Sequence, residues 1–173
     1  MTKLNKLEPF DKDGHVRMVV ETPRHSTVKL KYDTKSAHFS VSHGLALGVS
    51  YPFDWGFVPG TLGEDGDPID ALALHECATY PGVILTCSPL GVVEIEQKSK
   101  KGRIANPRLI LRPLWYQRMD ATEAAPELPK NLRDQLEQFF LSATFFTGKD
   151  PKIIGWRGPK AATALVRNAA KKD

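Results

Sequence analysis

The stretch Tyr51-Pro-Phe-Asp-Trp-Gly-Phe-Val-Pro-Gly60, followed at once by Thr61-Leu-Gly-Glu-Asp-Gly-Asp-Pro-Ile-Asp70, is the most informative part of this chain. It places three carboxylates, Asp65, Asp67 and Asp70, within six residues. Like charges held this close repel one another, whereas a hard, oxygen-seeking cation such as Mg²⁺ stabilises all three. The Asp-Gly step favours a tight turn, and Pro68 fixes its own φ, so the carboxylates project from a rigid bend. The stretch predicts a divalent-cation site, and an ordinary surface turn is the alternative because Asp, Gly and Pro dominate such turns.

The pattern Tyr-Pro-x-x-aromatic-Gly, then Pro-Gly-Thr-Leu, then Asp-Gly-Asp-Pro-Ile-Asp resembles the signature of the family I (soluble) inorganic pyrophosphatases. Upstream, residues 19–23 (Val-Val-Glu-Thr-Pro) and Lys29 fit the same resemblance, and so do residues 80–82 and 87–93 and the region of Phe139 downstream. The resemblance therefore covers most of the chain. It implies a single domain, residues 1–173, of the α+β class: an OB-like small β-barrel of short antiparallel strands with flanking C-terminal helices.

The resemblance also implies an activity, the hydrolysis of pyrophosphate to phosphate with Mg²⁺, or Mn²⁺ or another divalent ion, as cofactor. It assigns metal binding to Asp65, Asp67 and Asp70. It assigns catalytic roles to Asp67, as the base toward the attacking water, and to Tyr51 and Glu21. Substrate binding is assigned to Lys29, Tyr51, Arg103 and His43. The partner it implies is pyrophosphate or a related phosphorylated small molecule, together with further copies of the chain in a homo-oligomer.

Several positions depart from the family pattern, and most of them replace a family acid or phosphate ligand. Gln97, Lys98 and the basic run near Lys101 stand where the family has acidic metal ligands, and Lys31 replaces a Glu. His43 replaces an Arg, Trp55 replaces a Tyr, and Ala143-Thr144 replaces a Tyr-Lys pair. Loss of even an outer partner of a metal lowers affinity or activity about 10 to 100-fold, so we expect a weakened metal site.

Two hypotheses follow from the basic replacements. In the first, Lys31, Lys98 and Lys101 neutralise substrate oxygens directly, in place of cations. In the second, the protein is a non-catalytic relative that binds an anionic phosphorylated ligand or partner.

Residues 16 to about 111 are typical of short strands separated by Gly, Pro, Asn and Asp. Residues 27–32 alternate, with Val28, Leu30 and Tyr32 on one face and Lys29 on the other. Residues 83–87 and 91–96 predict two further strands on either side of Pro89.

The period changes after Pro126. Apolar residues at helical spacing between 132 and 143 predict a helix that has Pro129 in its first turn and Gly148 beyond its end. A second helix is predicted from Pro159 to about Ala170, with Ala161, Ala164, Leu165 and Ala169 on one face.

The composition is that of a globular protein: 173 residues, 41% hydrophobic and 25% charged, with a net charge of +4. No run is long and apolar enough for a membrane span, and the first ten residues lack a signal-peptide core. Cys77 and Cys87 match no metal or CxxC pattern, so we expect reduced cysteines and a cytoplasmic location. Nucleic-acid binding is a weaker alternative, which would use a basic and aromatic surface of Arg108, Arg112, Trp115 and Tyr116.

Overall fold

The computed structural model describes residues 3–116 and 123–170. Within them the strands, in chain order, are β1 (Val16–Thr22), β2 (Val28–Asp33), β3 (His38–Gly44), β4 (Asp54–Phe57), β5 (Asp70–Ala73), β6 (Ile84–Ser99), β7 (Gly102–Ala105), β8 (Arg108–Pro113) and β9 (Lys152–Arg157). The two α-helices are α1 (Lys130–Ala143) and α2 (Pro159–Ala169). Single 3₁₀ turns occur at η1 (Leu4–Lys6), η2 (Ala125–Glu127) and η3 (Phe145–Thr147).

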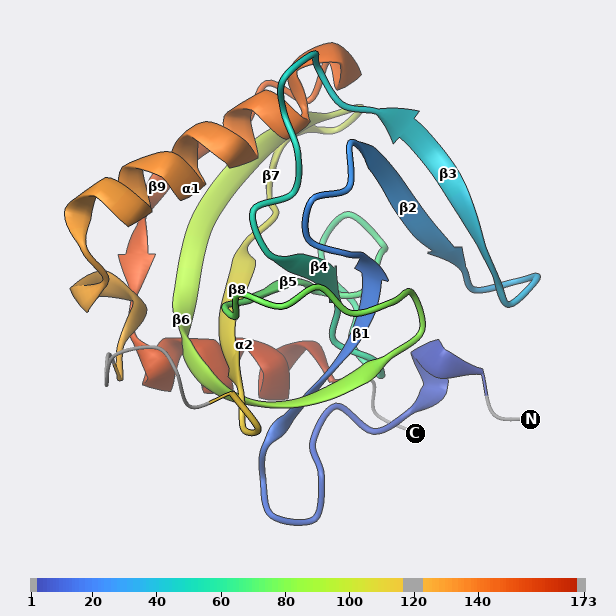
Figure 1. The fold of residues 1–173 in the computed structure, drawn as a ribbon, viewed down its shortest axis with the longest axis vertical. Helices are drawn as coiled ribbons and strands as arrows, with labels where there is room; N and C mark the ends of the chain where they lie inside the picture. Colours follow the sequence, from blue (N-terminus) through green and yellow to red (C-terminus); the bar gives the residue numbers. More distant parts are fainter. Residues whose placement is uncertain (1–2, 117–122, 171–173) are drawn as a thin grey trace.

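Five strands form a closed ring in the order β1-β4-β5-β8-β6, because β6 also pairs with β1 (Figure 1). Strands β7 and β9 pair with β6 outside this ring. The ring confirms the predicted OB-like barrel with C-terminal helices. One pairing departs from the expected antiparallel arrangement, since β5 and β8 run parallel.

Alternation along the ring strands buries both faces of the sheet. Leu109 and Leu111 of β8 belong to a core cluster that also contains Ala162 and Val166 of α2. Ile110, between them, belongs to a second cluster that contains residues of α1. Since successive side chains of a strand point to opposite faces, the two helices cover different faces of the sheet.

Strand β6 is one continuous strand of 16 residues, where the sequence predicted two strands separated at Pro89. The interruption is a bulge, because the pairing with β8 shifts register between Pro89 and Gly91. The end of β9 lies very close to Gly91: a Cβ atom on Gly91 would lie 2.2 Å from the Arg157 carbonyl oxygen. Proline and glycine therefore bend the strand without ending it.

Both predicted helices are confirmed, α1 directly after Pro129 and α2 from Pro159. The buried face of α2 centres on Ala162 and Val166, whereas Ala164, which the pattern placed on that face, is exposed. In the described part of the chain, no helix has the length and apolar character needed to cross a membrane.

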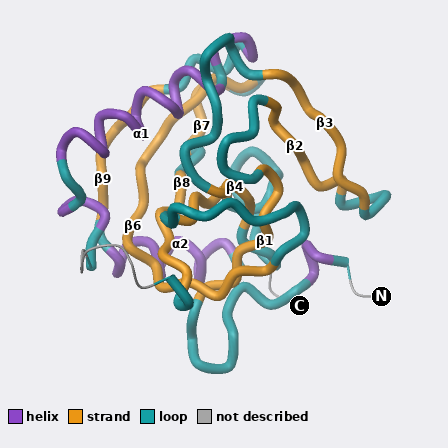
Figure 2. The backbone as a smooth tube through the Cα atoms, viewed as in Figure 1, coloured by secondary structure: helices purple, strands orange, loops and turns teal. Residues whose placement is uncertain are grey.

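The hairpin of β2 and β3 forms a separate two-stranded sheet that projects beside the ring (Figure 2). Its register shifts by one residue between Lys29 and Leu30. Residues of the hairpin and of the C-terminal end of α1 both line the cavity described below.

The close approach at Gly91 gives a test of the fold. We expect Gly91→Ala to lower the free energy of unfolding by about 1–3 kcal/mol, because the new methyl group overlaps backbone atoms of Arg157. Gly44→Ala is the matched control, since a Cβ atom there meets nothing within 4 Å. Urea denaturation measures both, and equal stabilities of the two variants would contradict the packing described for β6 and β9.

Candidate active site

A cavity of about 580 Å³ gathers residues from several distant segments. Its walls come from the end of β1, from β2 and β3, from the bend between β4 and β5, from the first residue of β8 and from the end of α1. Seven of the eight predicted site residues line it: Glu21, Lys29, His43, Tyr51, Asp65, Asp67 and Asp70. The fold thus brings together residues that are up to 49 positions apart, from Glu21 to Asp70.

The acidic bend, residues 63–70, is held by its own backbone. The Gly63 amide donates to the Asp67 carbonyl at 2.8 Å, and the Asp67 amide donates to Asp65 Oδ1 at 3.1 Å. Gly66 adopts φ +85°, a conformation that glycine reaches without steric cost. Asp70 is the first residue of β5, so the ring anchors the far end of the bend.

Two carboxylates of the bend already have cationic partners. Lys31 Nζ of β2 lies 2.8 Å from Asp67 Oδ2, and both side chains are about half exposed. Arg108 Nη1 lies 2.7 Å from Asp70 Oδ2, and the Arg108 side chain is almost buried. Asp65 makes no ion pair within the described part of the chain. Of the three aspartates of the bend, Asp65 is therefore the one without a cationic partner among the described residues.

Trp55 lies beneath the cationic side of the cavity. The Arg108 guanidinium lies over its ring at 5.3 Å from the centroid, and the Lys29 ammonium lies over it at 5.7 Å. An aromatic face attracts cations at this separation. The Trp55 ring thus lies against two positive charges of the cavity.

Burial controls the protonation of two groups in the cavity. Glu21 is 6% exposed, and burial raises its pKa to about 7; the neighbouring Asp70 raises it too, against an amide hydrogen bond from Tyr32 at 2.7 Å. Burial, with the charges of Asp70 and Glu21, also raises the pKa of Tyr51. Tyr51 is therefore a neutral hydrogen-bond donor at physiological pH, while Glu21 exchanges its proton near neutrality.

Burial likewise raises the pKa of Asp65, and the charges of Asp70 and Asp67 add to the effect. A carboxyl group in this situation is stabilised as a carboxylate when a cation arrives.

Lys149 also lines the cavity, although no motif identified it. It follows η3, and burial together with the charges of Lys29 and Arg108 lowers its pKa. No ion pair engages it among the residues that the structure describes. It lies close in sequence to Ala143-Thr144, and only its position in the fold shows that it faces the same cavity as the predicted site residues.

Arg103, the eighth predicted site residue, is not among the described residues that line the cavity. Its guanidinium lies 3.1 Å from the Asp150 carboxylate and donates to the Asp150 carbonyl at 2.8 Å. Lys98 lies 3.1 Å from the same carboxylate. Glu94 and Glu96, which share a face of β6, pair with Arg157 and Arg103. Lys98, near the end of β6, and Arg103 of β7 therefore both pair with Asp150.

Two of the four residues proposed for a nucleic-acid surface are buried. Arg108 is buried against Asp70, and Tyr116 is 5% exposed, with its hydroxyl donating to Glu76 at 3.0 Å. Trp115 packs edge-on against the buried His75 ring and is 52% exposed. Single-strand binding needs aromatic faces and cations that are open to bases and phosphates, so the burial of Arg108 and Tyr116 speaks against that alternative.

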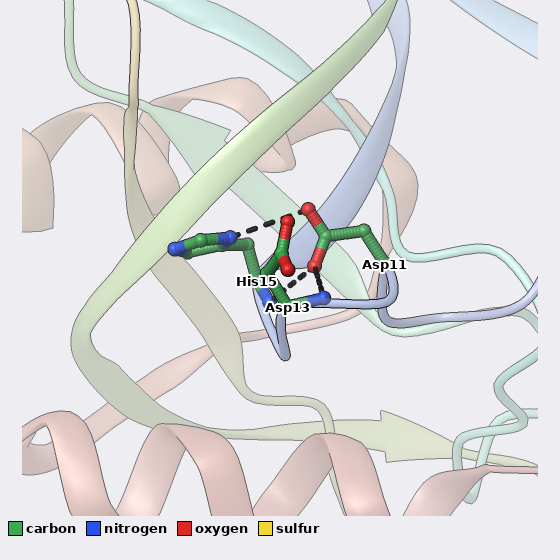
Figure 3. A group of neighbouring side chains, drawn as sticks. All are labelled: Asp11, Asp13 and His15. Atoms are coloured by element: carbon green, nitrogen blue, oxygen red, sulfur yellow. Dashed lines mark hydrogen bonds and ion pairs between the residues drawn. The ribbon is translucent and has the colours of Figure 1, made fainter.

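A second acidic group lies in the turn before β1 (Figure 3). Asp11, Asp13 and His15 bring three potential ligand atoms within 4.8 Å of one another, and no other group of three among the described residues does so. Asp11 Oδ1 accepts the amides of Asp13 and His15 at 2.9 and 2.8 Å. These bonds account for the cluster as a capped turn.

Residues 18–172 match the family model described as inorganic pyrophosphatase. The inorganic pyrophosphatase of Thermus thermophilus is 33% identical over 171 residues, which cover 96% of this chain and 95% of that protein. That of Aeropyrum pernix is 31% identical over 176 residues, which cover 99% and 98%. A crystal structure of the Thermus thermophilus enzyme superposes with a TM-score of 0.87 at 32% identity, over 98% of this chain and 97% of the other.

The buried Glu21 predicts a pH-dependent stability. Its folded pKa of about 7 lies above the ordinary value of 4.5, so the unfolded state loses its proton first and stability falls as pH rises between these values. Replacement of Glu21 by Gln removes this loss of stability at high pH. We expect Glu21→Gln to be more stable than the wild type at about pH 8, by up to about 3 kcal/mol, and similar to it at about pH 4.

Chemical denaturation in EDTA at both pH values measures the difference. Glu127→Gln, on an exposed turn, is the control and should leave the pH dependence unchanged. A gap between Glu21→Gln and wild type that does not widen with pH would contradict a buried, proton-exchanging Glu21.

Proposed function

Since the chain belongs to the inorganic pyrophosphatase family, we infer that it is an enzyme that hydrolyses pyrophosphate to two phosphates. The observation that carries this function to particular residues is the cavity, which is lined both by the acidic bend and by Lys29 and Lys149, two lysines without an ion pair in the described structure. Acids on one side can activate water, and cations on the other can hold a diphosphate.

Asp67 is the general base in this proposal. Its carboxylate lies at the tip of the acidic bend and is half exposed to the cavity, so a water molecule can reach it. Asp67 takes a proton from the water that attacks one phosphorus atom, the bond from that phosphorus to the bridging oxygen breaks, and the second phosphate leaves with the bridging oxygen. The ion pair with Lys31 fixes the direction of the carboxylate.

Lys29 and Lys149 hold the phosphates. Both ammonium groups line the cavity, and neither makes an ion pair within the described residues, so their charge is available to phosphoryl oxygens. Tyr51 remains protonated and can donate a hydrogen bond, and His43 lines the same wall beside Ser42. We assign these residues to orientation of the substrate.

The cavity's donor set suits a divalent cation by its chemistry. Its potential ligands are carboxylate oxygens, which Mg²⁺ prefers, and Asp65 lacks a cationic partner in the described structure. Among the described residues, however, Asp65, Asp67 and Asp70 do not bring three ligand atoms within 4.8 Å of one another, so their side chains must turn toward a bound ion. We propose that Asp65, with Asp70 and Asp67, would hold Mg²⁺ or Mn²⁺. Such an ion supplies a lowered pKa for water and neutralises charge on phosphoryl oxygens. Its affinity is reduced, because Gln97 and Lys98 replace family acids and two of the three aspartates are already paired.

The homo-oligomer that the resemblance implies stays a prediction, and so does the cytoplasmic location inferred from the cysteines and the first ten residues. So does the role of Arg103 as a phosphate ligand, which would require it to leave Asp150.

The general base can be tested by replacement. We expect Asp67→Asn to lower kcat for pyrophosphate hydrolysis by about 10² to 10⁴-fold, because the amide cannot accept the proton. Asp70→Asn should also lower activity through the metal, whereas Asp13→Asn, in the turn before β1, is the control that keeps wild-type activity. Equal phosphate release by the wild type, Asp67→Asn and Asp70→Asn would reject the assignment. A thermal shift with pyrophosphate but no turnover by the wild type would favour the binding-only alternative.

Lys149 gives a separate prediction about substrate binding. We expect Lys149→Met to raise KM for pyrophosphate about tenfold, because one charge-assisted contact to the substrate is lost. Lys149→Arg should restore much of the binding, since it retains the charge. Lys152→Met, a matched change at an exposed position of β9, should leave KM unchanged. Steady-state kinetics at fixed free Mg²⁺ measures all three, and an unchanged KM in Lys149→Met would remove Lys149 from the phosphate site.

A further inference from the structure

Lys31 is unusual because it is a cation placed inside the acidic side of the cavity. It comes from β2, 36 residues before Asp67, and its ammonium lies 2.8 Å from that carboxylate. The charges of Glu21 and Asp70 act on it as well. One carboxylate of the cavity thus contacts the ammonium group, and the charges of two others act on it.

The structure separates Lys31 from the other two basic replacements, Lys98 and Lys101. Lys31 lines the cavity, whereas Lys98 is more than half exposed and pairs with Asp150. Lys101 lies in the exposed turn between β6 and β7. Of the three positions, Lys31 alone is placed to act on the carboxylates of the acidic bend.

Arg108 forms an ion pair with Asp70, as Lys31 does with Asp67. Its guanidinium is 2.7 Å from Asp70, and the Trp55 ring lies against it. A nearly buried arginine in this position is a permanent counter-ion, because it does not lose its proton.

These pairs leave the cavity balanced in charge. Among the described residues, five carboxylates and five lysine or arginine side chains line it: Glu21, Asp33, Asp65, Asp67 and Asp70, and Lys29, Lys31, Lys35, Arg108 and Lys149. A cluster of divalent ions would add several positive charges beside ammonium groups, and at such short distances repulsion opposes each added ion.

We propose that the Lys31 ammonium takes the place of one divalent cation in the cavity, so that the chain without substrate binds a single divalent ion, held from the Asp65 side. This inference rests on the proposed function, because it concerns the ions that serve that reaction. The built-in ammonium neutralises Asp67, and its charge reduces the repulsion among Asp67, Glu21 and Asp70, without any requirement for a second metal. The wild-type enzyme therefore needs fewer free divalent ions than an acid at position 31 would demand.

The test counts bound ions in the absence of pyrophosphate. Equilibrium dialysis and electron paramagnetic resonance with Mn²⁺ give the number of ions per chain for the wild type, Lys31→Met and Lys31→Glu. We expect about one Mn²⁺ per wild-type chain and about one more in each variant, with the added ion bound about tenfold or more tightly in Lys31→Glu than in Lys31→Met. Lys98→Met is the matched control, since it removes an ammonium outside the cavity, and it should bind as the wild type does.

Circular dichroism confirms that each variant is folded, and folding is expected because Lys31 is about half exposed. A wild-type chain that binds no ion, or two or more, would overturn the inference, and so would unchanged counts in both Lys31 variants. The outcome is separable from the proposed function. If the wild type hydrolyses pyrophosphate but the number of bound ions does not change in the Lys31 variants, only the role of Lys31 is rejected. If the numbers of bound ions are as expected but the wild type does not hydrolyse pyrophosphate, only the enzymatic function is rejected.

Discussion

The structure depends on the neutralisation of the acidic bend. Asp65, Asp67 and Asp70 project from one bend, which hydrogen bonds within residues 63–67 hold, and the charges of Asp67 and Asp70 act on Asp65. The chain supplies cations from two other elements, β2 and β8, for two of these carboxylates. The third depends on burial and on whatever cation the cavity takes up. Charge compensation, more than any single contact, determines what the cavity can bind.

The closed ring of strands makes this compensation possible. Asp70 begins β5 and Arg108 begins β8, and these neighbouring strands run parallel, so their first residues lie at the same edge of the ring. The β2–β3 hairpin stands outside the ring and brings Lys31 across to the bend. The Asp70–Arg108 and Lys31–Asp67 pairs both join residues that are far apart in sequence. The pairing of β6 with β1 closes the ring of strands and so fixes the positions of the strands that carry Asp70 and Arg108.

Buried ionisable groups in this cavity oppose stability and favour chemistry. Glu21 is almost inaccessible and has no cation at ion-pair distance within the described structure, which is an unfavourable environment for a carboxylate. The same environment gives it a pKa of about 7, where a proton can move in either direction. Tyr51 stays protonated for the same reason. Sites with groups of this kind are commonly functional, since a fold under selection for stability alone would avoid them.

The sequence by itself determined several elements and most of the residues predicted for the site. Alternation and helical spacing identified β2, α1 and α2, because short stretches determine local geometry. The motifs and the family resemblance identified eight candidate residues, of which seven line one cavity. The tertiary structure decided the rest. It joined two expected strands into β6, assigned Arg108 to Asp70 in place of an exposed basic surface, turned Arg103 toward Asp150, and brought Lys149 into the cavity. Such partners are separated by tens of residues, and the direction of a long charged side chain depends on which carboxylate the fold sets within its reach.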